Sequence, residues 1–267
     1  MIGAVAETNP VWKKIRIGVL LVVLAIVATN AWLERRRSVS WRDSLYVAIV
    51  PVAADDSATT RRLISELRPE SFQPLEAFFA REARRYGLAL DEPFRVELHP
   101  PVEALPPPAP DEPSPWSTML WSLRMRWYAA HAGSMAGQPA AHVRMFVLYH
   151  DPLRNAELPH SVGLQKGRIG LVHAFASATM AGANLIVIAH ELLHTVGATD
   201  KYDASSNAPR YPEGFADPGQ QPRFPQLRAE IMAGRRALSD TQFEMPEDLD
   251  DCVVGATTAI EIGWTPR

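Results

Sequence analysis

The chain has 267 residues, of which 47% are hydrophobic and 21% charged, and its formal net charge at pH 7 is -3. This composition is ordinary for a globular protein of one or two domains, and the weakly acidic balance gives no reason to expect nucleic acid as a partner. Cys252 is the single cysteine, so no disulfide can form within the chain. A lone cysteine neither indicates nor excludes an oxidising compartment.

The first predicted element is an apolar segment without charges at residues 17–33. Its length is at the short end for a membrane span, and cationic residues flank both of its ends. Trp12 and Trp32 bracket it, where indole rings favour the interface between lipid and water. We expect a retained single-pass anchor that contacts membrane lipid. A cleaved signal peptide with a poor cleavage site is the alternative.

Four segments that follow have the pattern of strands, being either continuously apolar or alternating. They are residues 45–52, 94–98, 142–150 and 169–175. Helices are expected at residues 59–67, 74–86, 116–131 and 248–262. Residues 100–115 contain eight prolines in sixteen positions and predict an extended surface connector.

The helix predicted at residues 116–131 is amphipathic. We expect its core-facing side to be the one that carries Trp116, Leu120, Leu123 and Trp127.

A further apolar helix, at residues 185–196, carries a cluster of polar side chains. His190 and His194 are one turn apart, with Cβ atoms about 5–6 Å from each other. Glu191 lies on the same side. Two imidazoles at this spacing can bind one zinc ion at about 2.0–2.1 Å, and the neighbouring carboxylate can take a proton from a metal-bound water. On an otherwise buried helix these polar groups would be costly unless a metal satisfied them.

Gly197 is expected to end this helix, because glycine adopts the left-handed conformation at the C′ position without a Cβ clash. The chain then reverses, so Asp200 can return beneath the metal as the third ligand. Asp203 and Glu213 are also near in sequence and remain alternatives for that position.

The pattern His190-Glu191-x-x-His194-x-x-Gly197-x-x-Asp200 resembles the extended zinc signature of the metzincin metallopeptidases. It is closest to the snapalysin-type variant, in which aspartate replaces the usual third histidine. The resemblance implies an α+β fold: an α/β-like upper subdomain with a mixed twisted sheet and an active-site helix, then a loop-rich lower subdomain.

By the same resemblance, residues 161–167 would form an antiparallel edge strand at the cleft, able to capture an extended peptide. A plain loop is the alternative for this segment. Met232 would lie in a tight turn under the metal, as a soft apolar floor. Tyr202 and Tyr211 could reach the cleft and donate to an oxyanion, or they could simply pack.

The expected organisation is one folded domain behind an anchor. Its parts are an N-terminal tail at residues 1–16, the anchor at 17–33, a juxtamembrane linker at 34–44, and a metallopeptidase-like domain at 45–267, with the connector at 100–115 and the lower subdomain at 197–267.

The function implied is that of a membrane-anchored zinc endopeptidase acting on peptides or proteins. Its Zn²⁺ would be held by His190, His194 and Asp200, with Glu191 as general base. The flanking charges do not settle membrane orientation; resemblance to secreted relatives favours an extracytoplasmic catalytic domain. The alternatives are a non-catalytic zinc-binding receptor or scaffold and a zinc amidase acting on cell-wall peptides.

Four other histidines lie on or beside the predicted strands, where structural roles are commoner than metal ligation. They are His142, His150, His160 and His173. His160, next to the proposed edge strand, is the one to test.

Overall fold

The computed structural model describes residues 41–110, 114–132, 141–165 and 167–265, together with Trp12 and residues 16–22 and 24–25. The chain divides into two compact units, Met1–Ser40 and Trp41–Arg267. Most of the anchor predicted at residues 17–33 lies outside the described residues. Within the described part of the chain, no helix has both the length and the apolar character needed to cross a membrane.

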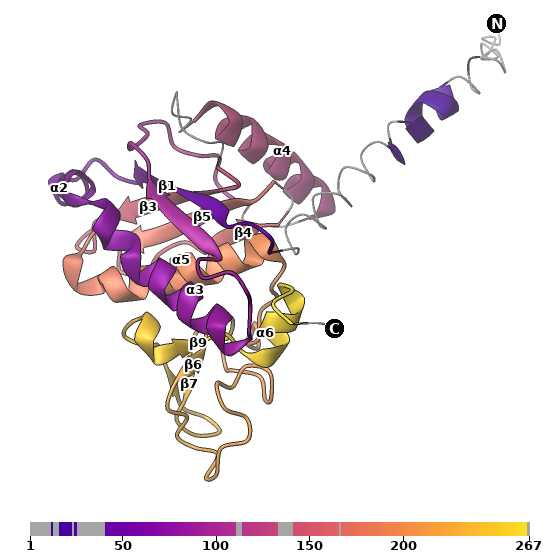
Figure 1. Cartoon of the computed structure of the whole chain (residues 1–267). Coiled ribbons are helices and arrows are strands. Elements are labelled where there is room, and N and C mark those ends of the chain that lie inside the picture. Colours follow the sequence, from indigo (N-terminus) through magenta and orange to yellow (C-terminus); the bar gives the residue numbers. More distant parts are fainter. Residues whose placement is uncertain are drawn as a thin grey trace, which may run out of the picture. The chain divides into compact units, whose positions relative to one another are not determined.

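A five-stranded sheet, in the order β2–β1–β3–β5–β4, is the centre of the second unit (Figure 1). β1 (Leu45–Ala53) runs parallel to β2 (Phe94–Leu98) and to β3 (Val143–His150), and β3 runs parallel to β5 (Ile169–Phe175). β4 (Val162–Leu164) pairs antiparallel with β5 at one edge. The four predicted strands are confirmed, and so is an antiparallel edge strand within residues 161–167.

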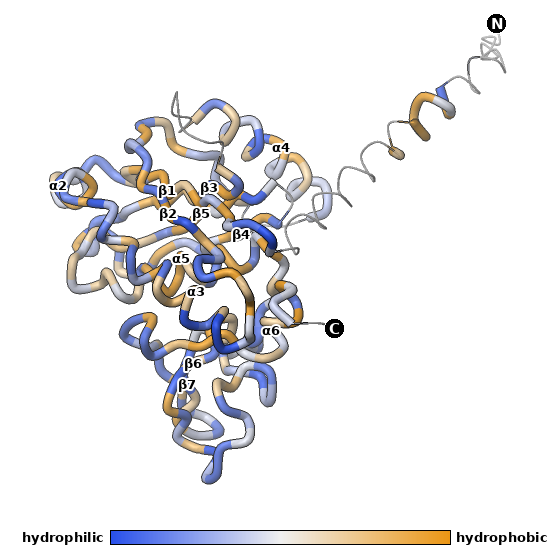
Figure 2. The backbone as a smooth tube through the Cα atoms, in the orientation of Figure 1, coloured by the Kyte–Doolittle hydropathy of each residue, from blue (hydrophilic) through white to orange (hydrophobic). Residues whose placement is uncertain are grey.

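Helices cover both faces of this sheet, which explains why its inner strands are apolar on both sides. The helices and short 3-10 turns before the lower region are α2 (Ala58–Glu66), η1 (Pro69–Phe72), α3 (Gln73–Arg85), α4 (Pro115–His131), η2 (Ala178–Met180) and α5 (Ala181–Val196). Figure 2 shows hydrophobic segments along the central strands and α5. The fold is thus mixed α and β, as the sequence predicts.

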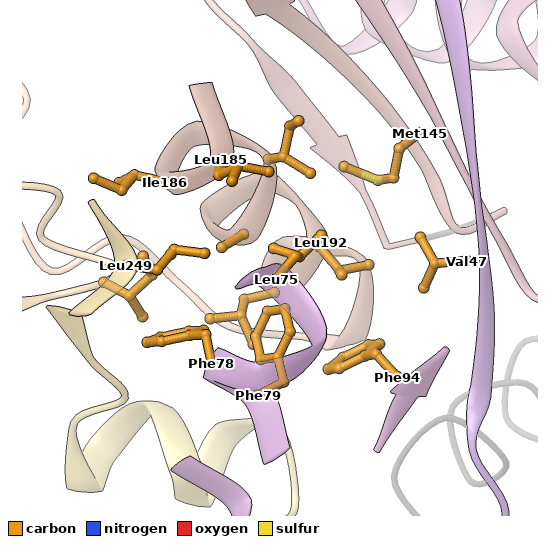
Figure 3. Packing of buried hydrophobic residues seen from close by; sticks show 14 of the residues in the cluster. Val47, Leu75, Phe78, Phe79, Phe94, Met145, Leu185, Ile186, Leu192 and Leu249 are labelled. Carbon is orange, nitrogen blue, oxygen red and sulfur yellow. The ribbon is translucent and has the colours of Figure 1, made fainter. Parts of the chain in front are cut away.

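Two hydrophobic clusters fill the space on either side of the sheet. The larger one contains Leu75, Phe79 and Leu192, which Figure 3 shows packed between α3, α5 and the strands. The smaller one lies under α4 and contains Trp121 and Phe146. Every member of both clusters belongs to the Trp41–Arg267 unit, so this unit has its own core.

The predicted orientation of α4 is wrong. Trp116, Leu120, Leu123 and Trp127 are 49–76% exposed, and the buried side carries Trp121, Met125, Tyr128 and Ala129 instead.

Both faces of α4 are apolar, so hydrophobicity alone does not choose between them. Polar groups of two aromatic side chains determine which face is buried. Trp121 Nε1 donates to the Pro107 carbonyl at 2.9 Å, and the Tyr128 hydroxyl donates to the Ala104 carbonyl. Both acceptors lie in the proline-rich connector.

The region after Gly197 is loop-rich, as the sequence predicts. Its regular elements are short: β6 (Ala229–Glu230), β7 (Arg236–Ala237), β8 (Phe243–Glu244), η3 (Leu249–Asp251), β9 (Cys252–Val253) and α6 (Ala256–Glu261).

The closing helix predicted at residues 248–262 is therefore mostly wrong. Two buried carboxylates account for this: Glu82 accepts from the Val254 amide at 3.0 Å and Glu230 from the Gly255 amide at 3.1 Å. These contacts hold the backbone extended before α6 begins.

Candidate metal centre

Helix α5 positions the two predicted histidine ligands. It is apolar nearly all round, and Ile188, Leu192 and Leu193 are buried in the core. The helix ends at Val196, and Gly197 follows with φ of 112°, the left-handed region that favours glycine. The chain turns at once and brings residue 200 back towards the helix.

Three ligand atoms meet at this turn. The Nε2 atoms of His190 and His194 are 3.1 Å apart, and Asp200 Oδ1 lies 3.2 Å from the first and 3.1 Å from the second. A tetrahedral zinc with bonds of about 2.0–2.1 Å separates its ligand atoms by about 3.3 Å. Among the described residues, these three make up the one group of histidine, cysteine and acidic side chains arranged to hold a metal ion.

Backbone carbonyls orient both imidazoles. His190 Nδ1 lies 3.0 Å from the Ile231 carbonyl oxygen, and His194 Nδ1 lies 2.9 Å from that of Ala198. Because a carbonyl only accepts, each Nδ1 carries the proton and each Nε2 presents a lone pair to the centre. Asp200 Oδ1 is buried with no hydrogen-bond partner in the described part of the chain. Three electron pairs facing one point repel one another unless a cation lies between them, so the residues fit a metal.

The electrostatics of the cluster also favour positive charge. Burial by itself would lower the pKa of His190, but Asp200, Glu191 and the Ile231 carbonyl outweigh it and raise that pKa. For Asp200, burial acts to raise the pKa, but a proton on the facing imidazole nitrogens, in the place that a metal cation would take, holds it well below its usual range. The centre thus attracts a cation and keeps the third ligand ionised.

Glu191 lies beside the cluster, and its Oε2 is buried without a hydrogen-bond partner among the described residues. Burial raises the pKa of this carboxyl above its usual value, although the two imidazoles act to lower it. The edge strand packs directly on it: a Cβ added at Gly163 would lie 2.4 Å from the Glu191 carbonyl oxygen and 2.6 Å from His194 Cβ. Only glycine fits there.

A glutamate that the sequence analysis missed fixes the segment carrying Asp200. The Glu261 carboxylate, in α6, accepts from the Thr199 amide at 2.9 Å, the Thr199 hydroxyl at 2.7 Å and Lys201 Nζ at 2.7 Å. The residues on both sides of the third ligand are therefore held by one side chain. We call Glu261, Thr199 and Lys201 the clamp.

The two alternative third ligands lie outside the cluster. The Asp203 carboxylate accepts hydrogen bonds from Ser205 and Ser206 within its own turn. Glu213 is exposed.

Met232 is fully buried in the turn that also supplies the Ile231 carbonyl to His190. The Lys201 amide donates to the Met232 carbonyl at 3.0 Å, which links this turn to the clamp. Glu230, also missed from sequence, holds the turn from below by accepting from the Ala233 and Gly255 amides and the Thr258 hydroxyl.

The two predicted tyrosines differ in position. The Tyr202 ring centroid lies 6.4 Å from that of His190, and burial raises the pKa of its hydroxyl. Tyr211 is half exposed, with its hydroxyl 3.5 Å from the Pro218 carbonyl and the Arg223 guanidinium over its ring. Tyr202 is the tyrosine beside the candidate site.

None of the four other histidines named from the sequence belongs to the metal cluster formed by the described residues. His150 Nε2 and His173 Nδ1 are 2.8 Å apart and bond to each other, and His142 accepts from the Tyr46 amide. His160 is exposed.

Comparison with known proteins adds nothing to this geometry. No model of a known protein family matches the chain, and no curated protein is significantly similar to it.

Proposed function

We propose that this chain is a zinc-dependent endopeptidase of the metzincin type, in which His190, His194 and Asp200 hold the metal. One observation carries the proposal: three lone-pair atoms lie within 3.1–3.2 Å of one another beside the buried carboxylate of Glu191. Zinc bound there would supply a Lewis acid that polarises a carbonyl group and makes a water molecule more acidic.

Glu191 is the general base of the proposed reaction. Its carboxylate accepts the proton of the attacking water and then donates it to the leaving amine. A raised pKa suits this exchange, because it brings the acid and base forms closer in energy near neutral pH. Tyr202 is the nearer candidate for donating to the developing oxyanion.

β4 is the proposed binding strand for the substrate. Among the described strands it pairs only with β5, so its other edge can hydrogen-bond an extended peptide. The absence of a side chain at Gly163 lets one face of β4 lie directly against α5 at Glu191 and His194. An antiparallel edge strand beside the metal helix, followed by a loop-rich region, supports a metzincin-like arrangement of two subdomains. The anchor at residues 17–33 and an extracytoplasmic catalytic domain rest on the sequence and belong to the same proposal.

The decisive experiment compares Glu191→Gln with the native full-length chain, measuring bound metal and cleavage of an unstructured protein. We expect one zinc per chain in both, and hydrolysis reduced by about 10²–10⁴-fold in the variant. Equal turnover would remove Glu191 as the base. Zinc binding without hydrolysis of any peptide bond by the native chain would favour a scaffold, and cleavage confined to cell-wall peptides would favour an amidase.

A matched pair of variants, Asp200→Asn and Asp203→Asn, tests the assignment of the third ligand. They remove one carboxylate each, three residues apart in the same loop. We expect Asp200→Asn alone to lose zinc, measured by competition with a chelator. Equal zinc loss in both variants would reject Asp200 as the specific ligand.

A further inference from the structure

Helix α4 exposes an apolar stripe on the side opposite the sheet. Its members are Trp116, Met119, Leu120, Leu123 and Trp127, which are 49–76% exposed. At 100° per residue they fall on one side of the helix, opposite the buried Trp121, Met125 and Tyr128. Single exposed apolar residues are ordinary, but a contiguous stripe of five with two tryptophans marks an interaction surface.

Cationic side chains border this stripe. By helical geometry, Arg124 lies along one side of it and Arg126 along the other. Between Pro115 and His131 the helix contains no acidic residue. An arginine at such a border can lay its methylene groups on an apolar phase and keep its guanidinium at the polar boundary.

A basic cavity adjoins the C-terminal half of the same helix. It has a volume of about 160 Å³, and Arg126, Arg144, Arg168 and His142 contribute to its wall. None of the described residues that line it is acidic. The Arg144 guanidinium is fixed there by donating to the Ala129 carbonyl of α4 at 2.7 Å. Guanidinium groups gathered in this way suit a phosphate oxyanion. Arg126 borders the stripe and also lines the cavity, so the two features adjoin each other.

We propose that this surface docks the Trp41–Arg267 unit onto an anionic lipid bilayer. The stripe enters the boundary between headgroups and acyl chains, and the cavity takes a lipid phosphate. Tryptophans near both ends of the stripe suit that boundary, and the bordering arginines complement anionic headgroups.

The anchor of the proposed function adds a second reason for choosing a bilayer. The predicted anchor ends at residue 33, so residues 34–40 separate it from Trp41. Seven residues span at most about 25 Å. A membrane holding the anchor would therefore lie within reach of the folded unit. The proposal goes beyond hydrolysis and stands whether or not the metal site is catalytic.

The test uses the full-length chain with a polarity-sensitive dye on Leu123→Cys, because the native Cys252 is buried. The vesicles contain phosphatidylcholine alone or mixed with phosphatidylglycerol. We expect the dye emission to shift to the blue in the mixed vesicles, by an amount that shrinks as salt is added. The same dye on Leu153→Cys, at a leucine 92% exposed outside α4, is expected not to shift. Equal responses at the two positions would overturn the proposal.

Second substitutions in the labelled chain separate the two parts of the surface. Trp127→Ser and Arg126→Ser should each raise the phosphatidylglycerol content needed for half of the shift by about tenfold. Leu227→Ser, at a leucine 75% exposed elsewhere, should leave it unchanged.

The same test distinguishes two other occupants of this surface, a free anion and a second copy of the chain. If inorganic phosphate replaces phosphatidylglycerol in producing the shift, the cavity binds a free anion and bilayer docking is wrong. If the shift follows protein concentration without vesicles, the stripe joins two copies of the chain and bilayer docking is also wrong.

Discussion

The two parts of the folded unit both supply ligands to the candidate metal, and they are held in different ways. Residues 41–196 form a sheet and helices around an apolar core, and α5 packs in that core while its two histidines stay partly exposed. Residues 197–265 have short strands. They add apolar side chains such as Met232 and Trp264 to the same core, and they also rely on two carboxylates, the buried Glu230 and the partly exposed Glu261. The helix that carries two ligands is thus held mainly by hydrophobic packing, whereas the segment that carries the third also needs polar contacts. Mutations of the apolar core and of the carboxylates should therefore differ in how they change the free energy of unfolding and the affinity for zinc.

The largest expected effect is that of Glu230→Ala in the lower part. It leaves the Gly255 amide and the Thr258 hydroxyl without their buried acceptor, and the Ala233 amide keeps only its bond to the main-chain carbonyl of residue 230. We expect the free energy of unfolding to fall by about 3–5 kcal/mol, measured by urea titration. Zinc affinity should fall as well, because the turn carrying the Ile231 carbonyl is released.

Glu244→Ala is the matched control for that variant. Glu244 pairs with Arg236 at the surface of the same region, where its side chain is 43% exposed. Its loss should cost less than about 1 kcal/mol. Similar losses in the two variants would mean that buried carboxylates do not hold the lower part.

Leu192→Ala tests the upper part. Leu192 is fully buried on α5 and packs near Leu75 and Phe79 (Figure 3). Its truncation should cost about 2–5 kcal/mol of unfolding free energy, whereas Leu192→Met should cost less than about 1.5 kcal/mol. The folded fraction should still bind zinc normally, since the carbonyls that orient the imidazoles remain in place. A large loss of zinc affinity in folded Leu192→Ala would show that core packing itself tunes the site.

Glu261→Gln tests the clamp. The amide keeps the shape of the side chain but removes the negative charge facing Lys201, which is 4% exposed. We expect zinc to bind about 10–100-fold more weakly, measured by chelator competition, because the backbone on both sides of Asp200 is loosened. Glu213→Gln, at an exposed glutamate of the same loop region, should change nothing. Native affinity in Glu261→Gln would mean that the turn at Gly197 places Asp200 without help.

The same division explains what the sequence could predict. The strands and the end of α5 follow from local hydrophobic patterns and from Gly197, so they could be read from neighbouring residues. The clamp joins residues 60 and 62 positions apart, and Glu230 reaches Thr258 28 positions on. Nothing local marks such glutamates as structural. The sequence predicts the wrong core face for α4 because the helix is apolar on two sides, and only acceptors in the connector decide between them.

The smallest expected effect is a pH dependence in the upper part, at the pair formed by His150 and His173. Burial, aided by the neighbouring His150, lowers the pKa of His173 to about 4. The unfolded chain takes up this proton near pH 6.5, so the stabilising contribution is present above that pH and is lost as pH falls towards 4. His173 is partly solvated, and screening limits the loss to about 1–2 kcal/mol. The thermal midpoint of His173→Asn should therefore fall less between pH 7 and pH 5 than that of the native chain. Equal falls would place the acid sensitivity elsewhere, with the carboxylates of the lower part as the next groups to test.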